Sequence, residues 1–186
     1  MSKNLNALIE AAIFAALAMV LSFIPDFANW FSPSFGAIPL VLFALRRGTK
    51  YGLLAGLIWG LMHFILGKVY YLSLSQVLIE YILAFISMGL AGLLSANLQT
   101  AIRAHKTKKA WFIGLLASFL AVGVRYFWHF LAGVIFWGSY APKGVSAVWN
   151  SFTVNGIAGL STFILVTLSL SLLLTVQAGF FIPKKA

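Results

Sequence analysis

Glu80 is the residue of this sequence whose type and position most clearly indicate chemistry. It is the one carboxylate that falls in the middle of a long apolar run, and ionisable groups in such places usually serve a function. Gln76 and Ser73 precede it by four and seven residues, so the three side chains would share one helix face. The carboxylate could contact a ligand or form an ion pair with Arg125 on another apolar run, and one use does not exclude the other.

A second polar stripe surrounds His129. Arg125 lies four residues before it and Gly133 four residues after it, which puts a cation, an imidazole and bare backbone on one helix face. A single buried histidine is often only hydrogen-bonded to a nearby backbone group. Gly133 supports a ligand contact instead, because a residue without a side chain leaves room beside the imidazole. Both interpretations stay open.

Aromatic residues gather near one set of segment ends. An aromatic belt at the lipid headgroups explains most of these rings, namely Trp30, Tyr70, Tyr71, Trp137, Tyr140 and Trp149. Trp59 is too deep in its segment to belong to such a belt. Aromatic faces combined with one carboxylate would form a suitable cage for a flat organic cation.

The elements that must position these groups are membrane-spanning helices. Of the 186 residues, 62% are hydrophobic and 9% are charged, whereas a soluble domain has roughly 25% charged residues. Apolar runs recur along the chain, and their length is close to the roughly 20 residues that a helix needs to cross a bilayer. We therefore predict an all-α integral membrane protein with a single membrane domain over residues 1–186. The absence of cysteine excludes disulfides, thiolate metal sites and cysteine nucleophiles.

Six apolar segments are bounded by glycine, proline or charged residues. They cover residues 5–24, 35–46, 51–67, 70–95, 110–137 and 147–182. The second is short and framed by Pro33, Pro39 and Arg46, so it could be tilted, kinked or only partly spanning. No internal repeat is found, which argues against an inverted-repeat secondary transporter.

The net charge of +10 does not indicate nucleic-acid binding, because the basic residues lie in short clusters between apolar runs. Both chain ends and one set of connections hold Lys3, Arg46, Arg47, Lys50, Arg103, Lys106, Lys108, Lys109, Lys184 and Lys185. The alternate connections hold only Lys68 and Lys143. The positive-inside rule therefore predicts that both termini are cytoplasmic and that the connections near Asp26, Lys68 and Lys143 lie outside.

This orientation puts the unusual side chains of four segments at one level. With a rise of about 1.5 Å per residue, Trp59, His129 and Asn155 lie ~12 Å below the outer face. Glu80 lies ~15 Å below it by the same measure. The convergence predicts a pocket in the outer half of the membrane that opens to the outside.

Enzyme chemistry has little support. The middle of the spans holds no second carboxylate for an aspartyl dyad and no histidine or carboxylate cluster for a metal. A serine–histidine protease would need one serine placed against His129, and no local context singles one out. An intramembrane enzyme is therefore the weakest of the functions considered.

The first apolar segment has a face of small residues, with Ala12 and Ala16 four positions apart. Such spacing allows two helices to approach closely in lipid. The face could pack within its own bundle or bind a partner subunit, and the sequence does not separate these possibilities.

Three blocks, Leu72–Tyr81, Arg125–Trp137 and Ser151–Gly156, resemble the thiamine-specific S-component of energy-coupling factor (ECF) transporters. The resemblance extends over nearly the whole chain and includes Ile38-Pro39 and Leu45–Gly48. It implies the six-helix S-component fold in a bacterial plasma membrane, with thiamine bound near the extracellular face. It also implies that this chain has no catalysis and no cofactor of its own. The partners would be a transmembrane coupling subunit, docked on Ala12 and Ala16, and two ATP-binding-cassette ATPases that use ATP.

The resemblance also implies individual roles at the site. In the family, the groups that match Glu80, His129 and Asn155 contact the aminopyrimidine, and the ring that matches Trp137 stacks on it. Trp30 matches a tryptophan in the loop over the ligand. The remaining binding positions are Trp59, Tyr70, Tyr81, Arg125, Gly133, Asn150 and Ser151.

The rim of the expected site departs from the family. Asn150 replaces a tyrosine, Lys68 a histidine, Pro142 a tryptophan and Arg125 a lysine. These changes leave open the relative affinities of the site for thiamine and for thiamine phosphates. An S-component for another vitamin and a small stand-alone channel or transporter are the alternative functions.

Overall fold

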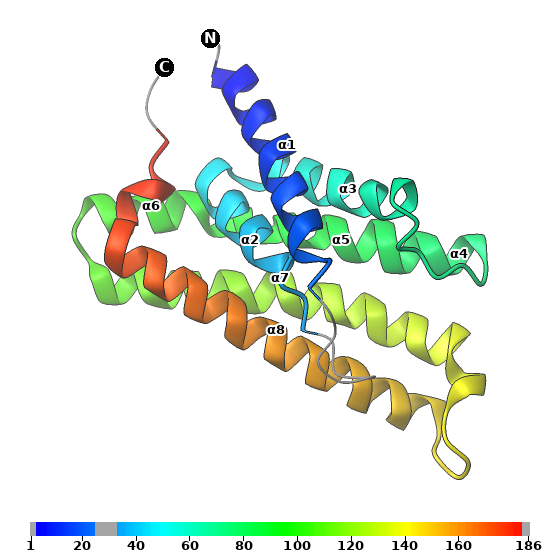
Figure 1. Cartoon of the computed structure of the whole chain (residues 1–186). Coiled ribbons are helices and arrows are strands. Elements are labelled where there is room, and N and C mark those ends of the chain that lie inside the picture. The colour runs from blue at the N-terminus through cyan, green and yellow to red at the C-terminus, as the bar shows by residue number, and fades with distance from the viewer. Residues whose placement is uncertain (1–2, 25–32, 184–186) are drawn as a thin grey trace.

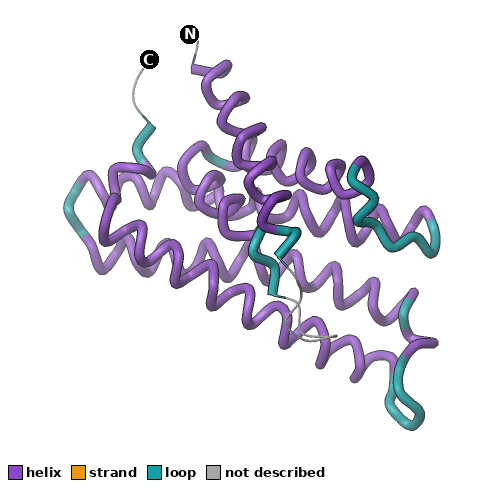
Figure 2. The backbone as a smooth tube through the Cα atoms, viewed as in Figure 1, coloured by secondary structure: helices purple, strands orange, loops and turns teal. Residues whose placement is uncertain are grey.

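The structure is a computed structural model that describes residues 3–24 and 33–183, and within them helices are the only regular secondary structure (Figures 1 and 2). The first three helices are α1 (Lys3–Leu21), α2 (Ala37–Arg47) and α3 (Thr49–Ile65). A continuous helical stretch follows over Leu74–Arg103. It consists of α4 (Leu74–Val77), the π-helical turn η1 (Leu78–Leu83), α5 (Ala84–Ile86), the 3₁₀ segment η2 (Ser87–Leu94) and α6 (Ser95–Arg103). The chain ends with α7 (Thr107–Phe136), the 3₁₀ turn η3 (Gly138–Tyr140), α8 (Ala147–Gln177) and the 3₁₀ turn η4 (Ala178–Phe181).

These elements form six helical stretches, as the apolar segments predict, and the all-α membrane class is confirmed. Four stretches, α1, Leu74–Arg103, α7 and the one that begins with α8, are long and apolar enough to cross a bilayer. The fourth stretch extends to Arg103, beyond the predicted end at residue 95. The reason is that α6 is polar on one face, so the helix continues after the continuous apolar run has stopped.

The short second segment is a helix of 11 residues in the centre of the bundle. Leu40, Phe43 and Leu45 have no exposed surface, and α2 contacts α1, α3, η2 and α8. Gly48 joins α2 to α3 with a φ of 84°, a left-handed conformation that favours glycine. The chain therefore turns back at once, and α2 serves as a core element.

Glycines allow α3 to pack against η2 at backbone contact. A methyl group on Gly89 would lie 2.2 Å from the backbone nitrogen of Leu53, and one on Gly92 would lie 2.3 Å from that of Thr49. Small residues at such positions let membrane helices approach closely. This contact fixes the position of the Leu74–Arg103 stretch relative to α3.

The N-terminal half of α1 is attached to the bundle by an ionic cluster. Glu10 accepts hydrogen bonds from the Nε atoms of Arg46 (2.9 Å) and Arg47 (2.7 Å). Arg46 also donates to the carbonyl of Phe180, and its guanidinium lies 5.2 Å from the centre of that ring. The cluster joins α1, α2 and η4.

The outer surface of the long helices is apolar. Exposed side chains include Ile13 and Val20 on α1, Phe119 on α7 and Leu168 on α8. A contiguous surface of this kind would be unfavourable in water. It is the surface expected of helices in contact with lipid tails.

Candidate ligand-binding site

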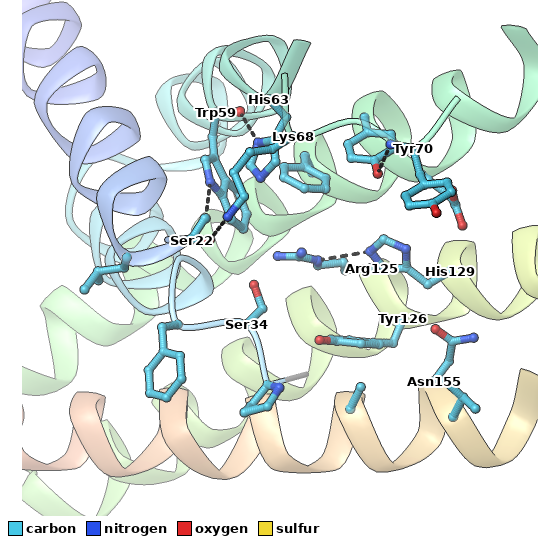
Figure 3. A pocket seen from close by; sticks show the side chains of 18 of the residues that line it. Ser22, Ser34, Trp59, His63, Lys68, Tyr70, Arg125, Tyr126, His129 and Asn155 are labelled. Atoms are coloured by element: carbon cyan, nitrogen blue, oxygen red, sulfur yellow. Dashed lines mark hydrogen bonds between the residues drawn. The ribbon is translucent and has the colours of Figure 1, made fainter. Parts of the chain in front are cut away.

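A cavity of about 460 Å³ lies between α3, η1, α7 and α8, near the C-terminal end of α1 (Figure 3). Its size is within the range of small-molecule sites, roughly 300–1,000 Å³. Eight of the residues predicted to bind the ligand line it: Trp59, Tyr70, Glu80, Tyr81, Arg125, His129, Trp137 and Asn155. The convergence of Glu80, His129 and Asn155 on one cavity follows the expectation drawn from their depths.

Glu80 lies in the π-helical turn η1. One carboxylate oxygen accepts a hydrogen bond from the indole nitrogen of Trp137 at 3.0 Å, and the other accepts one from the side-chain amide of Gln76. Isolated π-helical turns inside longer helices occur frequently at functional sites. The widened turn was not foreseen from the sequence, because Leu78–Leu83 has the composition of an ordinary apolar helix.

Tyr70 and Tyr81 line the cavity together with Glu80. The backbone nitrogen of Tyr70 donates to the Tyr81 hydroxyl at 3.0 Å. The Tyr70 ring lies edge-on to Trp137, with 5.6 Å between the ring centres. Together these contacts attach the connection before α4 to both η1 and the end of α7.

Arg125 makes no ion pair with Glu80 in the part of the chain that the structure describes. Its guanidinium instead lies 4.6 Å from the ring centres of both Trp59 and Phe85. Its Nε atom donates to His129 Nε2 at 3.4 Å. The aromatic faces around Trp59, which the sequence suggested for a ligand cation, are therefore occupied by a cation of the protein itself.

The predicted residues Gly133, Ser151 and Asn150 are absent from the lining of this cavity. A methyl group on Gly133 would lie 2.2 Å from Ser151 Oγ, and that hydroxyl donates to the carbonyl of Phe130 at 2.8 Å. Gly133 thus permits close contact between α7 and α8, and the space that the sequence suggested for a ligand is filled by Ser151. Trp30 lies outside the described residues.

Ser151 also orients the side chain of Asn155. Its side-chain amide donates to the backbone carbonyl and to the hydroxyl of Ser151, both at 3.1 Å. With the amide nitrogen held in this way, the oxygen of Asn155 is directed to accept a hydrogen bond. Ser151 therefore positions a residue of the cavity without lining it.

Several residues of the cavity were not predicted as binding residues, among them Ser22, Ser34, His63, Lys68, Phe85 and Tyr126. The spacing of His63, four residues after Trp59 on the same helix, was a usable signal. His63 Nδ1 is 2.9 Å from the carbonyl oxygen of Trp59. Ser22 and Ser34 gave no signal, because their position depends on how the chain returns between α1 and α2.

Thr162 connects α8 with the segment before α2. Its hydroxyl oxygen accepts a hydrogen bond from the backbone nitrogen of Ser34 at 2.9 Å and lies 2.8 Å from the Tyr126 hydroxyl. It also donates to the carbonyl of Ala158 at 2.7 Å. This buried hydroxyl holds one side of the cavity in place.

The chemistry of the lining suits binding. Glu80 can accept hydrogen bonds, His129 and Asn155 can pair with polar atoms of a ring, and aromatic rings surround them. Among the described residues, no group of three histidine, aspartate or glutamate side chains could hold a metal ion. The arrangement can recognise a small, flat, polar molecule.

The structure divides the small-residue face of α1. Ala11, Ala15 and Ala18 are buried in the bundle, whereas Ala12 and Ala16 are exposed. Exposed Ile13 and Leu17 lie beside them. The first set packs within the chain, and the second is open to contact with another protein or with lipid.

Comparisons with known proteins all lead to the same family. The model of the family described as thiamine transporter protein matches residues 8–182. The thiamine transporter ThiT of Lacticaseibacillus paracasei is 37% identical over 98% of this chain and 93% of its own length. ThiT of Bacillus subtilis is 33% identical over 92% of each chain. A solved structure of ThiT from Listeria monocytogenes is 44% identical, with a TM-score of 0.93 over 98% of this chain and 100% of the other.

Proposed function

This chain belongs to the thiamine transporter protein family, and we propose that it binds thiamine in the cavity around Glu80 and serves in thiamine uptake. The family and its named relatives are transport proteins rather than enzymes. The observation that carries the proposal is the meeting of Glu80, His129 and Asn155, from three helical stretches, at one cavity.

The chemistry of thiamine fits these groups. Its aminopyrimidine presents an amino donor beside a ring nitrogen, and a carboxylate such as Glu80 can accept from that amino group. His129 and Asn155 supply further polar partners for the ring. Trp137 donates to Glu80 at 3.0 Å and presents an indole next to it, where an aromatic ligand ring can stack. The thiazolium is a permanent cation that carboxylate and aromatic faces attract.

In the uptake cycle, the cavity would open to the extracellular side of the bacterial plasma membrane, with both termini in the cytoplasm. The concentration of lysine and arginine in alternate connections supports this orientation. The chain would act as the substrate-binding subunit of an ECF importer. A transmembrane coupling subunit and two ATP-binding-cassette ATPases would then provide the energy for release inside.

The exposed Ala12 and Ala16 are the surface proposed for the coupling subunit. Two alanines one helical turn apart allow a partner helix to approach closely. Apolar side chains around them, such as Ile13 and Leu17, would be covered at the same time. The buried Ala11 and Ala15 keep α1 in the bundle, so the two faces of this helix have separate roles.

Binding is tested by titrating the detergent-purified protein with thiamine while following tryptophan fluorescence. Trp59 and Trp137 line the cavity, so we expect quenching that saturates at one thiamine per chain. A thermal-shift series with other vitamins determines selectivity, because a ligand of the folded state raises the melting temperature. Stabilisation by another vitamin and not by thiamine would contradict the proposal.

Docking is tested by thiamine uptake in cells that also produce a coupling subunit and the two ATPases. Ala12→Trp should reduce uptake and leave thiamine binding by the purified subunit unchanged. Leu160→Trp on the exposed surface of α8 is the matched control, and it should affect neither. Uptake by the subunit alone, without ATPases, would instead favour a stand-alone transporter.

A further inference from the structure

The turn between α6 and α7 lies far from the ligand cavity. Figure 1 shows this turn at one end of the bundle and α4, which directly precedes the Glu80 turn η1, at the other. Trp137, which lines the cavity, follows the last residue of α7, whereas the α6–α7 turn precedes the first. Since α7 has 30 residues, its two ends are about 45 Å apart. A site at this turn is therefore separate from the one that binds thiamine.

Positive charge is concentrated at the turn. The exposed basic side chains of this cluster are Arg103, Lys106, Lys108 and Lys109. They form no ion pair in the part of the chain that the structure describes. The carboxylates of Glu10 and Glu80 belong to the ionic cluster on α1 and to the ligand cavity. The basic cluster therefore has no described acid against it, and it attracts anions.

A hollow of about 400 Å³ lies between α6 and α7 beside this turn. Asn97 and Thr100 of α6, Lys106 of the turn, and Lys109 and Phe112 of α7 contribute to its lining. The two ammonium groups and the amide nitrogen of Asn97 are hydrogen-bond donors. The hollow thus offers a phosphate group two positive charges and several donors, with an aromatic ring below them.

The backbone of the turn holds Lys106 in place. The Lys106 nitrogen donates to the carbonyl of Ala101 at 2.9 Å, and the His105 nitrogen donates to the carbonyl of Ile102 at 3.0 Å. His105 has a φ of 53°, the left-handed conformation in which many helices end. These bonds fix where the Lys106 side chain leaves the backbone relative to α6.

Below Lys109 the surface of α7 is apolar. Three exposed residues follow it at helical spacing on the same face, namely Phe112, Leu116 and Phe119. Their side chains are 66%, 46% and 64% exposed. Positive charge at the head of an exposed apolar stripe matches a phospholipid, whose anionic headgroup is joined to acyl chains. The stripe belongs to the surface expected to face lipid, which favours a lipid over a soluble protein.

We propose that the hollow between α6 and α7 binds an anionic phospholipid, with the phosphate at Lys106 and Lys109 and an acyl chain against Phe112. Basic pockets between membrane helices on the cytoplasmic side bind anionic headgroups. The proposed orientation of the chain assigns this lipid to the inner leaflet. Lipid binding itself does not depend on thiamine, and it holds this end of the bundle at the membrane surface.

The test is thermal unfolding of the detergent-purified protein with added phosphatidylglycerol, phosphatidylcholine or inorganic phosphate. Phosphatidylglycerol should raise the melting temperature, because a ligand of the folded state stabilises it. Phosphatidylcholine at the same concentration should raise it less, since its headgroup has no net charge. A rise with inorganic phosphate as large as that with phosphatidylglycerol would assign the hollow to free anions and would overturn the lipid site.

Two double variants separate the hollow from the rest of the basic cluster. Lys106→Gln/Lys109→Gln removes two exposed charges of the lining. Each lysine near anionic lipid contributes roughly 5-fold in affinity, so the phosphatidylglycerol concentration that gives the same rise in melting temperature should increase about 30-fold. Arg103→Gln/Lys108→Gln is the matched control. It removes two exposed charges outside the lining and should change that concentration far less.

The contrary outcomes are distinct. Equal losses in the two double variants would mean diffuse attraction by the whole cluster, and equal stabilisation by the two lipids would mean no preference for charge. Either result would overturn the site. Without any lipid effect, reduced thiamine uptake by Lys106→Gln/Lys109→Gln in cells with the coupling subunit and ATPases would assign the surface to a protein partner instead. Thiamine affinity of the purified protein should be the same in both double variants, so a failure of the lipid site leaves the proposed function intact.

Discussion

The ionic cluster around Glu10 and the cavity around Glu80 use carboxylates in opposite ways. Glu10 is bound directly by Arg46 and Arg47, so its negative charge is compensated in the folded chain. Glu80 has only the neutral partners Gln76 and Trp137. Arg125, which could have paired with it, lies against aromatic rings.

The two regions share close glycine packing and differ in helix type. A methyl group on Gly89 would lie 2.2 Å from the backbone nitrogen of Leu53, and one on Gly60, beside the cavity, would lie 2.1 Å from the carbonyl oxygen of Tyr81. Beside the cavity the helix widens into the turn η1, and Arg125 Nη1 lacks a partner in the described chain. The ionic cluster compensates the charge of its carboxylate, whereas the cavity holds Glu80 with neutral hydrogen-bond donors only.

Replacing Glu80 should give the largest effect on binding. Glu80→Ala removes the acceptor for the ligand and leaves the partner groups unpaired, which costs about 3–5 kcal/mol when the pair is buried. We expect thiamine affinity, measured by calorimetry, to fall at least ~100-fold. Affinity within a factor of two of the unmodified protein would exclude the proposed site.

Replacing Gly89 should give the largest effect on stability among the variants proposed here. In Gly89→Ala the added methyl would lie 2.2 Å from a backbone nitrogen of α3, and overpacking of this kind costs about 1–3 kcal/mol. Thermal unfolding in detergent should show a lower melting temperature. Gly123→Ala is the control, because nothing lies within 4 Å of its added methyl. Equal melting temperatures for the two variants would contradict the close packing of α3 and η2.

Glu10→Gln tests whether the ionic cluster around Glu10 and the cavity around Glu80 act independently. It weakens the hydrogen bonds to Arg46 and Arg47, and because Glu10 is partly exposed we expect a loss of about 1–2 kcal/mol in stability. The melting temperature should fall, while thiamine affinity should stay unchanged. A large loss of affinity would mean that the two regions are coupled.

Thr162→Val should have the smallest effect. The hydroxyl accepts from the Ser34 nitrogen at 2.9 Å, and one hydrogen bond contributes about 1 kcal/mol net. Thr167→Val is the matched control, since the Thr167 hydroxyl is buried without a partner among the described residues. Its removal should be neutral or stabilising. Melting curves that do not distinguish the two threonines would contradict the role assigned to Thr162.

Much of the fold could be predicted because a bilayer restricts the backbone structures that can span it. Apolar runs near the length of a span must be helical, and this reasoning located six helical stretches. It failed at helix ends that leave the apolar run, as at α6. Depth along each helix also brought Glu80, His129 and Asn155 to one level, since rise per residue is fixed.

The roles of single residues were harder to predict, because spacing along one helix does not give the neighbour on another. Gly133 indicated an open space, yet Ser151 fills it. Trp59 indicated a ring for the ligand cation, yet Arg125 occupies its face. Lys68 was noted only as a departure from the family, and His63 was not considered for the site.

By itself, the sequence determined the helical membrane class, the number of helical stretches and the level at which the unusual polar residues lie. These properties follow from local hydrophobicity and from the constant rise of a helix, which need no knowledge of neighbours. Only the tertiary structure decided which charges are paired: Glu10 with two arginines, and Arg125 with aromatic rings in place of Glu80. Ion pairs and cavities depend on how helices rotate and approach one another, and that arrangement is set by packing across the whole bundle.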